Sequence, residues 1–275
     1  MNSYDEKESN KDRLNYLFMS FIEYALNHNL INSKDFIGFC NNKDITSYQK
    51  LLKRNENEMQ SENNEMHPNG EHATLTLLNM ANIKSEEIIL DAGCGHGGVC
   101  RIIADHFSNP IIGIDNDCLK VLDAIFNTKI LQKHQITYYI DDAYHTHFQD
   151  NSFNIILRQH AVYGQNEETF IKECYRLLSR GGRIAFQGVL ANRKGNLFED
   201  KSKMEHYTLN EYRELLKKNG FNIIKWETEE STRELHDSYQ NVNQSLCMLV
   251  ESSIIIGVKI VAEKTSNTHE ELNIK

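Results

Sequence analysis

The chain of 275 residues contains only two prolines, Pro68 and Pro110, and no apolar run approaching the roughly 18 residues that a membrane span needs. Its six cysteines include no C-x-x-C pair, so we expect reduced, buried thiols in a cytoplasmic protein. A basic excess is also missing, since the formal net charge is −9. Proteins that bind a phosphate backbone normally carry such an excess. The sequence therefore predicts neither a membrane segment nor a nucleic-acid partner.

What is present suits a folded α/β protein, because 40% of the residues are hydrophobic and 25% are charged. The polar, acidic first ten residues do not resemble a signal peptide. Apolar residues at three-and-four spacing predict an amphipathic helix over 11–28. We expect an N-terminal helical extension over 1–71, a main domain over 72–265 and a disordered tail over 266–275.

Short apolar runs alternate with helical patterns from residue 72 onward, which predicts a doubly wound parallel sheet with helices on both faces. The expected strands are 88–90, 111–115, 136–140, 153–157, 184–189, 221–226 and 254–262. The expected helices are 72–81, 99–104, 118–133, 167–180, 208–219 and 233–250, with Thr208 and Glu211 forming a capping box.

The most informative stretch is 88–104, which reads I-I-L-D-A-G-C-G-H-G-G-V-C-R-I-I-A. It predicts a buried strand, a tight glycine turn and the start of a helix. Gly93 and Gly95 allow the backbone to approach a ligand closely, and the first N–H groups of the helix face the turn. This arrangement is typical of a site for a nucleotide-containing cofactor.

Two cofactor classes fit that stretch. Gly93, Gly95 and Gly98 satisfy G-x-G-x-x-G, and Asp115 follows at the distance expected of the acid that binds the ribose of a dinucleotide. Asp91 separates the two classes, because a carboxylate beside the turn repels a pyrophosphate but attracts an ammonium or a sulfonium. S-adenosylmethionine (SAM) carries both of these cations.

The run D-A-G-C-G-H-G resembles the first motif of the class I SAM-dependent methyltransferases, Asp/Glu-x-Gly-x-Gly-x-Gly. The resemblance covers about residues 72–263. It implies a Rossmann-like seven-stranded sheet with an antiparallel last strand, an N-terminal helical cap over the cofactor, and SAM as the cofactor. An oligomerisation arm is the alternative for the N-terminal helices.

The resemblance also implies the residues that hold the cofactor. Asp115 would accept the ribose hydroxyls, and Asn116 would reach the adenine side. Asp142 would accept the adenine amino proton beside Ala143, with Asp141 as its rival because the two are neighbours. The full set of expected cofactor residues is Asp91, Gly93, Cys94, Gly95, Asp115, Asn116, Asp142, Ala143 and Gln159.

Candidate catalytic residues follow the fourth strand, in R-Q-H-A-V-Y-G over 158–164. His160 suits the role of a general base near neutral pH, and Tyr163 would line the pocket. The alternative for His160 is a structural hydrogen bond to a backbone carbonyl. Asp141, His145 and His147 lie close together in the sequence, but no fourth ligand of suitable spacing follows, so we expect no metal site.

The acceptor is expected to be a small molecule. Methyltransferases that act on nucleic-acid bases usually carry an Asp/Asn/Ser-Pro-Pro-aromatic loop after the fourth strand, whereas this chain has Q-H-A-V. The layout resembles prenyl-diphosphate C-methyltransferases, although Gln159 or His160 stands where those enzymes carry a Glu. The segment W-E-T-E-E-S-T-R-E-L-H-D-S-Y resembles glycine and dimethylglycine N-methyltransferases.

The sequence thus predicts a cytoplasmic SAM-dependent methyltransferase of specialised metabolism that acts on a small molecule at C, N or O. Two alternatives stay open: an NAD-type oxidoreductase, and a SAM-binding protein of the same fold that does not transfer the methyl group. The identity of the acceptor and the oligomeric state are also open, with a homo-oligomer among the options.

Overall fold

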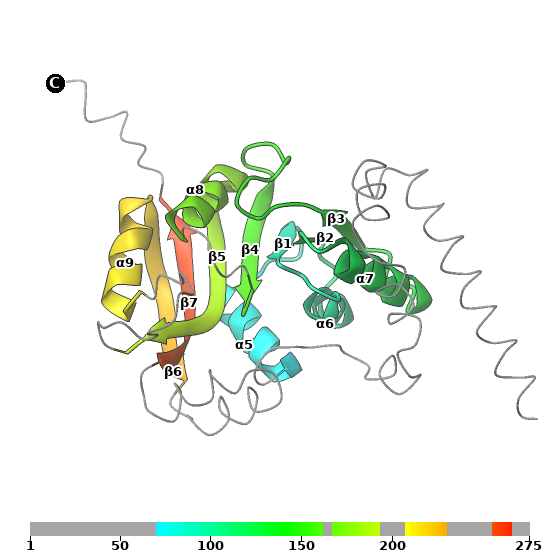
Figure 1. Cartoon of the computed structure of the whole chain (residues 1–275), viewed down its shortest axis with the longest axis horizontal. Helices are drawn as coiled ribbons and strands as arrows, with labels where there is room; N and C mark the ends of the chain where they lie inside the picture. Colours follow the sequence, from blue (N-terminus) through cyan, green and yellow to red (C-terminus); the bar gives the residue numbers. More distant parts are fainter. Residues whose placement is uncertain (1–69, 162–166, 193–206, 230–254, 266–275) are drawn as a thin grey trace, which may run out of the picture.

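A mixed sheet of seven strands organises the computed structural model, which describes residues 70–161, 167–192, 207–229 and 255–265 (Figure 1). The strand order is β3-β2-β1-β4-β5-β7-β6, and β7 runs antiparallel to both of its neighbours. The strands are β1 (Ile89–Ala92), β2 (Ile111–Asp115), β3 (Ile136–Ile140), β4 (Phe153–Gln159), β5 (Leu178–Ala191), β6 (Phe221–Glu229) and β7 (Ile255–Lys264). The predicted sheet with a reversed last strand is therefore confirmed.

Helices cover both faces of this sheet. One hydrophobic cluster joins it to α5 (Gly70–Ala81), α6 (Gly98–His106) and α7 (Cys118–Ile130). A second cluster, on the other face, joins it to α8 (Glu167–Leu177) and α9 (Leu209–Lys218). Among the helices that the structure describes, none combines the length and the apolar character required to cross a membrane.

The central strands alternate their side chains between the two clusters, as the pleat of a strand requires. Ile89 and Ile155 enter the first cluster, whereas their neighbours Leu90 and Ile156 enter the second. Strands buried on both faces read as continuous apolar runs. This explains why the run at 88–90 and the run at 153–157 were recognisable as strands in the sequence.

Most element boundaries agree with the sequence. β2 and β3 have the predicted bounds, and α9 begins with the predicted capping box, in which Thr208 accepts from the backbone N–H of Glu211. The largest difference lies between α8 and β5. The helix ends at Leu177 rather than at residue 180, and the strand begins at Leu178, six residues earlier than predicted. The predicted turn at Gly181, which has a φ of 71°, lies inside β5, and the pairing of β5 with β4 shifts register there.

Several predicted elements lie outside the described residues. They are the N-terminal extension up to residue 69 with its helix at 11–28, the helix at 233–250 and the tail at 266–275. The proposed division into extension, main domain and tail stays a prediction.

A buried ion pair fixes the start of α8 to the end of β4. Nη1 of Arg158 lies 2.6 Å from Oε1 of Glu167, which also accepts a hydrogen bond of 2.8 Å from the hydroxyl of Tyr212. The guanidinium lies between the rings of Phe170 and Phe186, 4.8 and 4.7 Å from their centres. The end of β4 is therefore anchored through α8 and α9.

We predict that Glu167→Ala lowers the free energy of unfolding by about 3 to 5 kcal/mol, since removing one member of a buried pair leaves the other charge uncompensated. Glu168 provides a matched control, because it is the next residue of α8 and pairs at the surface with Lys172 and Lys218. Glu168→Ala should change stability little. Chemical denaturation of both variants measures the difference, and equal losses would contradict the argument.

Candidate active site

The turn after β1, residues 93–97, is called the glycine bend below. Its three glycines have left-handed backbones, with φ of 81° at Gly93, 52° at Gly95 and 78° at Gly97. The N–H groups of Gly93 and Cys94 both donate to the carbonyl of Ile114, at 2.8 Å. These bonds extend the pairing of β1 with β2 beyond the strand and fix the glycine bend at the carboxyl edge of the sheet.

Gly97 and Gly95 of the glycine bend differ in how tightly they are packed. A Cβ at Gly97 would collide with the hydroxyl of Tyr138 and lie 2.9 Å from Cβ of Ala124. A Cβ at Gly95 would meet nothing within 4 Å. The space beside Gly95 is therefore open to a ligand, whereas Gly97 is required for packing against α7.

Asp115 ends β2 directly beside the glycine bend. Its Oδ2 accepts a hydrogen bond of 3.0 Å from the N–H of Gly95, and its Oδ1 accepts one of 2.9 Å from the N–H of Asp117. Each carboxylate oxygen has a second lone pair, so the group retains the capacity to accept from ligand hydroxyls. Asn116, also predicted for the site, is exposed at the same turn.

Asp91 lies inside β1 and is only 2% exposed. The thiol of Cys100, on α6, donates to its Oδ2 at 3.2 Å. Burial raises the pKa of the Asp91 carboxyl to about 7, opposed by the Cys100 hydrogen bond and increased by the charge of Asp115. A buried carboxylate of this kind is stabilised in its charged form by a nearby cation. The site therefore favours a cationic ligand.

The turn after β3 carries the predicted adenine residues. Oδ1 of Asp142 accepts from the N–H of Tyr144 at 3.0 Å. Asp141 is engaged more heavily, because Oδ1 accepts from the N–H of Asp142 and Oδ2 lies 2.6 Å from Nδ1 of His147. These local contacts favour Asp142, beside Ala143, as the residue available to a ligand. The described residues contain no group of three or more side chains arranged to hold a metal ion.

The end of β4 brings Gln159 and His160 to the same edge. The side chain of Gln159 accepts from the hydroxyl of Thr74 at 3.2 Å and donates to the side chain of Gln187 at 2.7 Å. His160 has a φ of 47°, which is unusual for a residue other than glycine, and its N–H donates to the carbonyl of Gln187 at 2.9 Å. Such strained backbones cluster at functional sites. Tyr163 lies outside the described residues.

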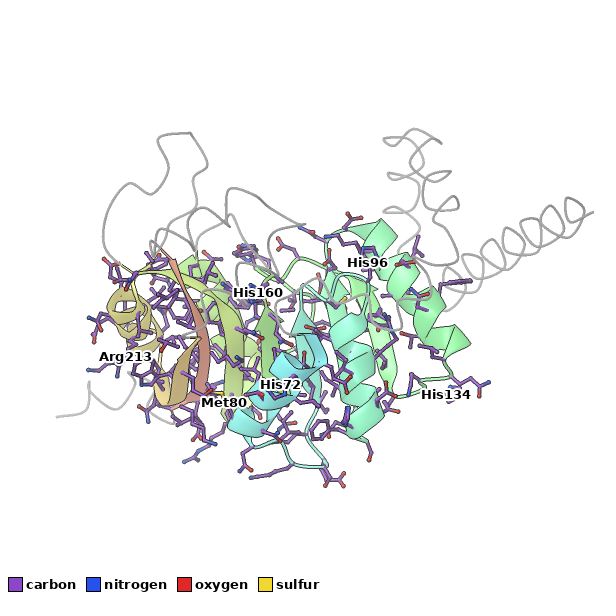
Figure 2. All side chains as sticks on the ribbon, turned by 90° about the horizontal axis from the view of Figure 1, so that it is seen from below. His72, Met80, His96, His134, His160 and Arg213 are labelled. Atoms are coloured by element: carbon purple, nitrogen blue, oxygen red, sulfur yellow. The ribbon has the colours of Figure 1, made fainter. Side chains whose placement is uncertain are left out.

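His96 occupies the glycine bend and is not among the residues that the sequence predicts for the site. Its Nδ1 lies 2.6 Å from Oδ2 of Asp123 on α7, and its carbonyl accepts from Nη1 of the buried Arg101 at 2.8 Å. Figure 2 places His96 and His160 toward one edge of the sheet and His134 toward the opposite edge. A histidine inside a glycine-rich turn is the only signal that the sequence offered, since its partner lies 27 residues away.

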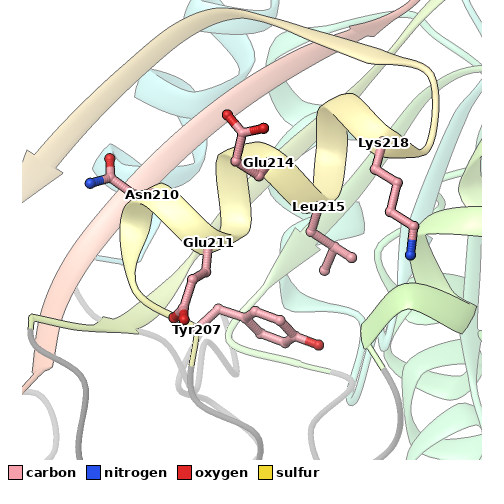
Figure 3. A pocket seen from close by; sticks show the side chains of 6 residues that line it. All are labelled: Tyr207, Asn210, Glu211, Glu214, Leu215 and Lys218. Atoms are coloured by element: carbon pink, nitrogen blue, oxygen red, sulfur yellow. The ribbon is translucent and has the colours of Figure 1, made fainter.

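A hollow of about 480 Å³ lies elsewhere, along α9 (Figure 3). Its lining residues are Tyr207, Asn210, Glu211, Glu214, Leu215 and Lys218. None of the predicted site residues contributes to it. The candidate active site is therefore the carboxyl edge formed by the glycine bend and the ends of β2, β3 and β4.

The strand order, the reversed β7 and the acidic glycine bend define the fold of the class I SAM-dependent methyltransferases. Residues 90–186, which run from β1 into β5, match the family model described as "Methyltransferase domain". The match confirms, over this part of the chain, the predicted resemblance to the SAM-dependent methyltransferases.

One relative and two solved structures illustrate the similarity. Phosphoethanolamine N-methyltransferase of Plasmodium falciparum is 26% identical over 156 residues, which are 54% of this chain and 58% of that enzyme. The chain thus spans just over half the length of this curated relative.

Geranyl diphosphate C-methyltransferase from Streptomyces coelicolor A3(2), solved with S-adenosyl-L-homocysteine (SAH), superposes with a TM-score of 0.62 at 13% identity, over 70% of this chain and 80% of that one. The 4+2 cyclase SpnF superposes with a TM-score of 0.62 at 18% identity, over 72% and 82%. Because the sequence identities are below 20%, the two superpositions establish the fold alone.

We predict that Gly95→Ala weakens binding of SAH about tenfold or more, because an extra methyl group in a close contact costs about 1 to 3 kcal/mol. Gly181→Ala is the matched control, since Gly181 also has a positive φ, of 71°, and also has nothing within 4 Å of a Cβ. Both variants should lose a similar amount of stability from the left-handed backbone, about 1 to 2 kcal/mol. Calorimetry should show a binding loss for Gly95→Ala alone, and equal affinities would place the ligand elsewhere.

Proposed function

We propose that the protein transfers a methyl group from SAM to a small-molecule acceptor, at carbon, nitrogen or oxygen. The observation that carries this proposal is the buried carboxylate of Asp91 behind a glycine bend whose outer side is open at Gly95. The pyrophosphate of a dinucleotide would meet repulsion there from Asp91. A sulfonium and an ammonium would be attracted.

The described residues divide the work between holding the donor and handling the acceptor. Gly95 would allow close approach of SAM, Asp115 would accept from its ribose, and Asp142 would accept from its adenine. When bound, SAM would supply an electrophilic methyl group on a positively charged sulfur. Alignment of donor and acceptor alone can supply an effective molarity of about 10⁵ to 10⁸ M.

His160 is the proposed general base for an acceptor that must lose a proton. It follows β4 directly, at the edge where the glycine bend lies, and its strained backbone is held through the N–H bond to Gln187. A carbon acceptor that already carries a nucleophilic pair would not need this step. Tyr163 is proposed to line the same pocket.

The acceptor is proposed to be a small molecule because the chain has a net charge of −9 and lacks the proline-containing loop of base methyltransferases. The names of its relatives include both an N-methyltransferase of phosphoethanolamine and a C-methyltransferase of geranyl diphosphate. We propose a cytoplasmic location as well, which is supported by the free, buried thiols of Cys94, Cys100 and Cys174. A homo-oligomer remains part of the proposal.

A second function is favoured by one specific observation: SpnF shares the fold and is named as a cyclase. A protein of this kind would bind SAM without transferring its methyl group. Incubation with SAM labelled on the methyl carbon, together with a panel of small amines, phenols and prenyl diphosphates, separates the two functions. Transfer of label supports methylation, whereas SAM binding without transfer to any acceptor favours the second function.

The same preparation tests the oxidoreductase alternative by calorimetry with SAM, SAH and NADH. We expect SAM and SAH to bind and NADH not to bind. Binding of NADH without binding of SAH would overturn the proposed function.

We predict that His160→Asn lowers the turnover of an acceptor that needs deprotonation by about 10² or more, which is the usual contribution of a general base. Asparagine tolerates the left-handed backbone better than alanine, so the fold should survive. The dissociation constant of SAH should stay within about twofold. His134→Asn, at the opposite edge of the sheet (Figure 2), is the control and should leave turnover unchanged. An unaffected rate in His160→Asn would assign His160 the structural role instead.

A further inference from the structure

Cys100 and Asp91 form a buried contact directly behind the glycine bend. Cys100 is 0% exposed and Asp91 is 2% exposed. The thiol donates to Oδ2 of the carboxylate at 3.2 Å. A thiol is a weak donor, but its proton has little competition from water at such a buried position.

Close packing against β2 fixes the position of the Cys100 thiol. A Cβ at Gly113 of β2 would lie only 3.1 Å from Sγ of Cys100 and closer still to the ring of Tyr138. The absence of a side chain at Gly113 therefore creates the space in which α6 brings its thiol against β1. The strand register agrees with this packing, because Gly113 of β2 pairs with Asp91 of β1.

Asp91 is faced by several titratable groups from the elements around it. The carboxylate of Asp115 comes from β2, and the thiol of Cys94 comes from the glycine bend. Two further groups affect the pKa values of the neighbouring thiols. The hydroxyl of Tyr138, on β3, acts on Cys100, and the ammonium of Lys120, on α7, acts on Cys94. Burial and the charge of Asp115 both disfavour the charged form of Asp91. Among these groups, the hydrogen bond from the Cys100 thiol favours the charged form.

We propose that Cys100 is a positioning residue for the cofactor: its thiol proton holds Asp91 in the charged form, and the site thereby prefers the sulfonium donor SAM over its uncharged-sulfur product SAH. The proposal rests on the proposed function. It assigns to Cys100 a part in releasing the product, because a site that discriminates by charge loses affinity for the cofactor once the methyl group has left.

The charge of Asp91 links this preference to pH. Because burial raises the pKa of Asp91 to about 7, the carboxyl is protonated at lower pH and charged at higher pH. SAM binding should therefore strengthen as pH rises through about 7 and then level off. SAH lacks the sulfonium charge, so its affinity should follow the same direction with a smaller amplitude.

The test is the dissociation constants of SAM and SAH, measured by calorimetry between about pH 5.5 and 8.5, for the wild type and for Cys100→Ala and Cys100→Ser. In Cys100→Ala the midpoint of the SAM profile should move to higher pH. A shift of one pH unit would weaken SAM binding about fivefold at pH 7 and leave it nearly unchanged at pH 8.5. In Cys100→Ser, where a stronger donor replaces the thiol, the midpoint should move to lower pH.

Two further variants complete the experiment. Asp91→Asn removes the titrating group and should give a flat profile with a reduced preference for SAM over SAH. Cys174→Ala, at a buried thiol that belongs to the cluster on the other face of the sheet, controls for loss of a core sulfur and should leave the midpoint unmoved.

The outcomes separate the role of Cys100 from the proposed function. A loss in Cys100→Ala that is equal at all pH values, or a Cys100→Ser midpoint that stays at the wild-type value, overturns the role of Cys100 while the proposed function stands. Should Cys100→Ala fold poorly, the direction of the Cys100→Ser midpoint decides. A wild type that binds neither SAM nor SAH overturns the proposed function itself.

Discussion

The carboxylate of Asp91 is buried in the middle of the sheet, at the place where the first strand meets the glycine bend. Moving a charge from water into a protein interior is costly unless another charge or a hydrogen bond compensates it. Within the described residues the compensation comes from a weak thiol donor, and Asp115 adds a second negative charge nearby. A nearby cation would stabilise this carboxylate, and the neighbouring contacts hold the glycine bend beside it rigid.

Rigidity comes from contacts that join the glycine bend to two elements, β2 and α7. The carbonyl of Ile114 binds it to β2, Gly97 packs against Ala124 of α7, and His96 pairs with Asp123 of the same helix. Because α7 begins three residues after Asp115, these contacts tie the glycine bend to the element that follows the carboxylate proposed to bind the ribose. The two are also joined directly, through the N–H of Gly95. A site held in this way needs little reorganisation when a ligand binds.

The sequence predicts the sheet and the glycine bend well because both depend on local patterns. β2 and β3 are short apolar runs bounded by polar turns, and Thr208 with Glu211 is a local capping motif. Contacts between distant residues were not predictable. The pair His96–Asp123 spans 27 positions and the bond between Thr74 and Gln159 spans 85. The boundary of β5 was missed because pairing with β4 across a register shift, rather than local propensity, decides where that strand begins.

The arrangement of the sheet separates the two tasks that a methyltransferase must combine. Asp91 lies within β1, Asp115 ends β2 and Asp142 follows β3 on one side of the edge, whereas His160 follows β4. The buried pair Arg158–Glu167 and the Gln159–Gln187 contact secure β4 independently of the glycine bend. With His160 in its proposed role, a change of acceptor chemistry can be made in the residues that follow β4, beyond the pairing of Leu157 with Asp91. This explains physically how one fold can occur in proteins named for nitrogen methylation, carbon methylation and cyclisation.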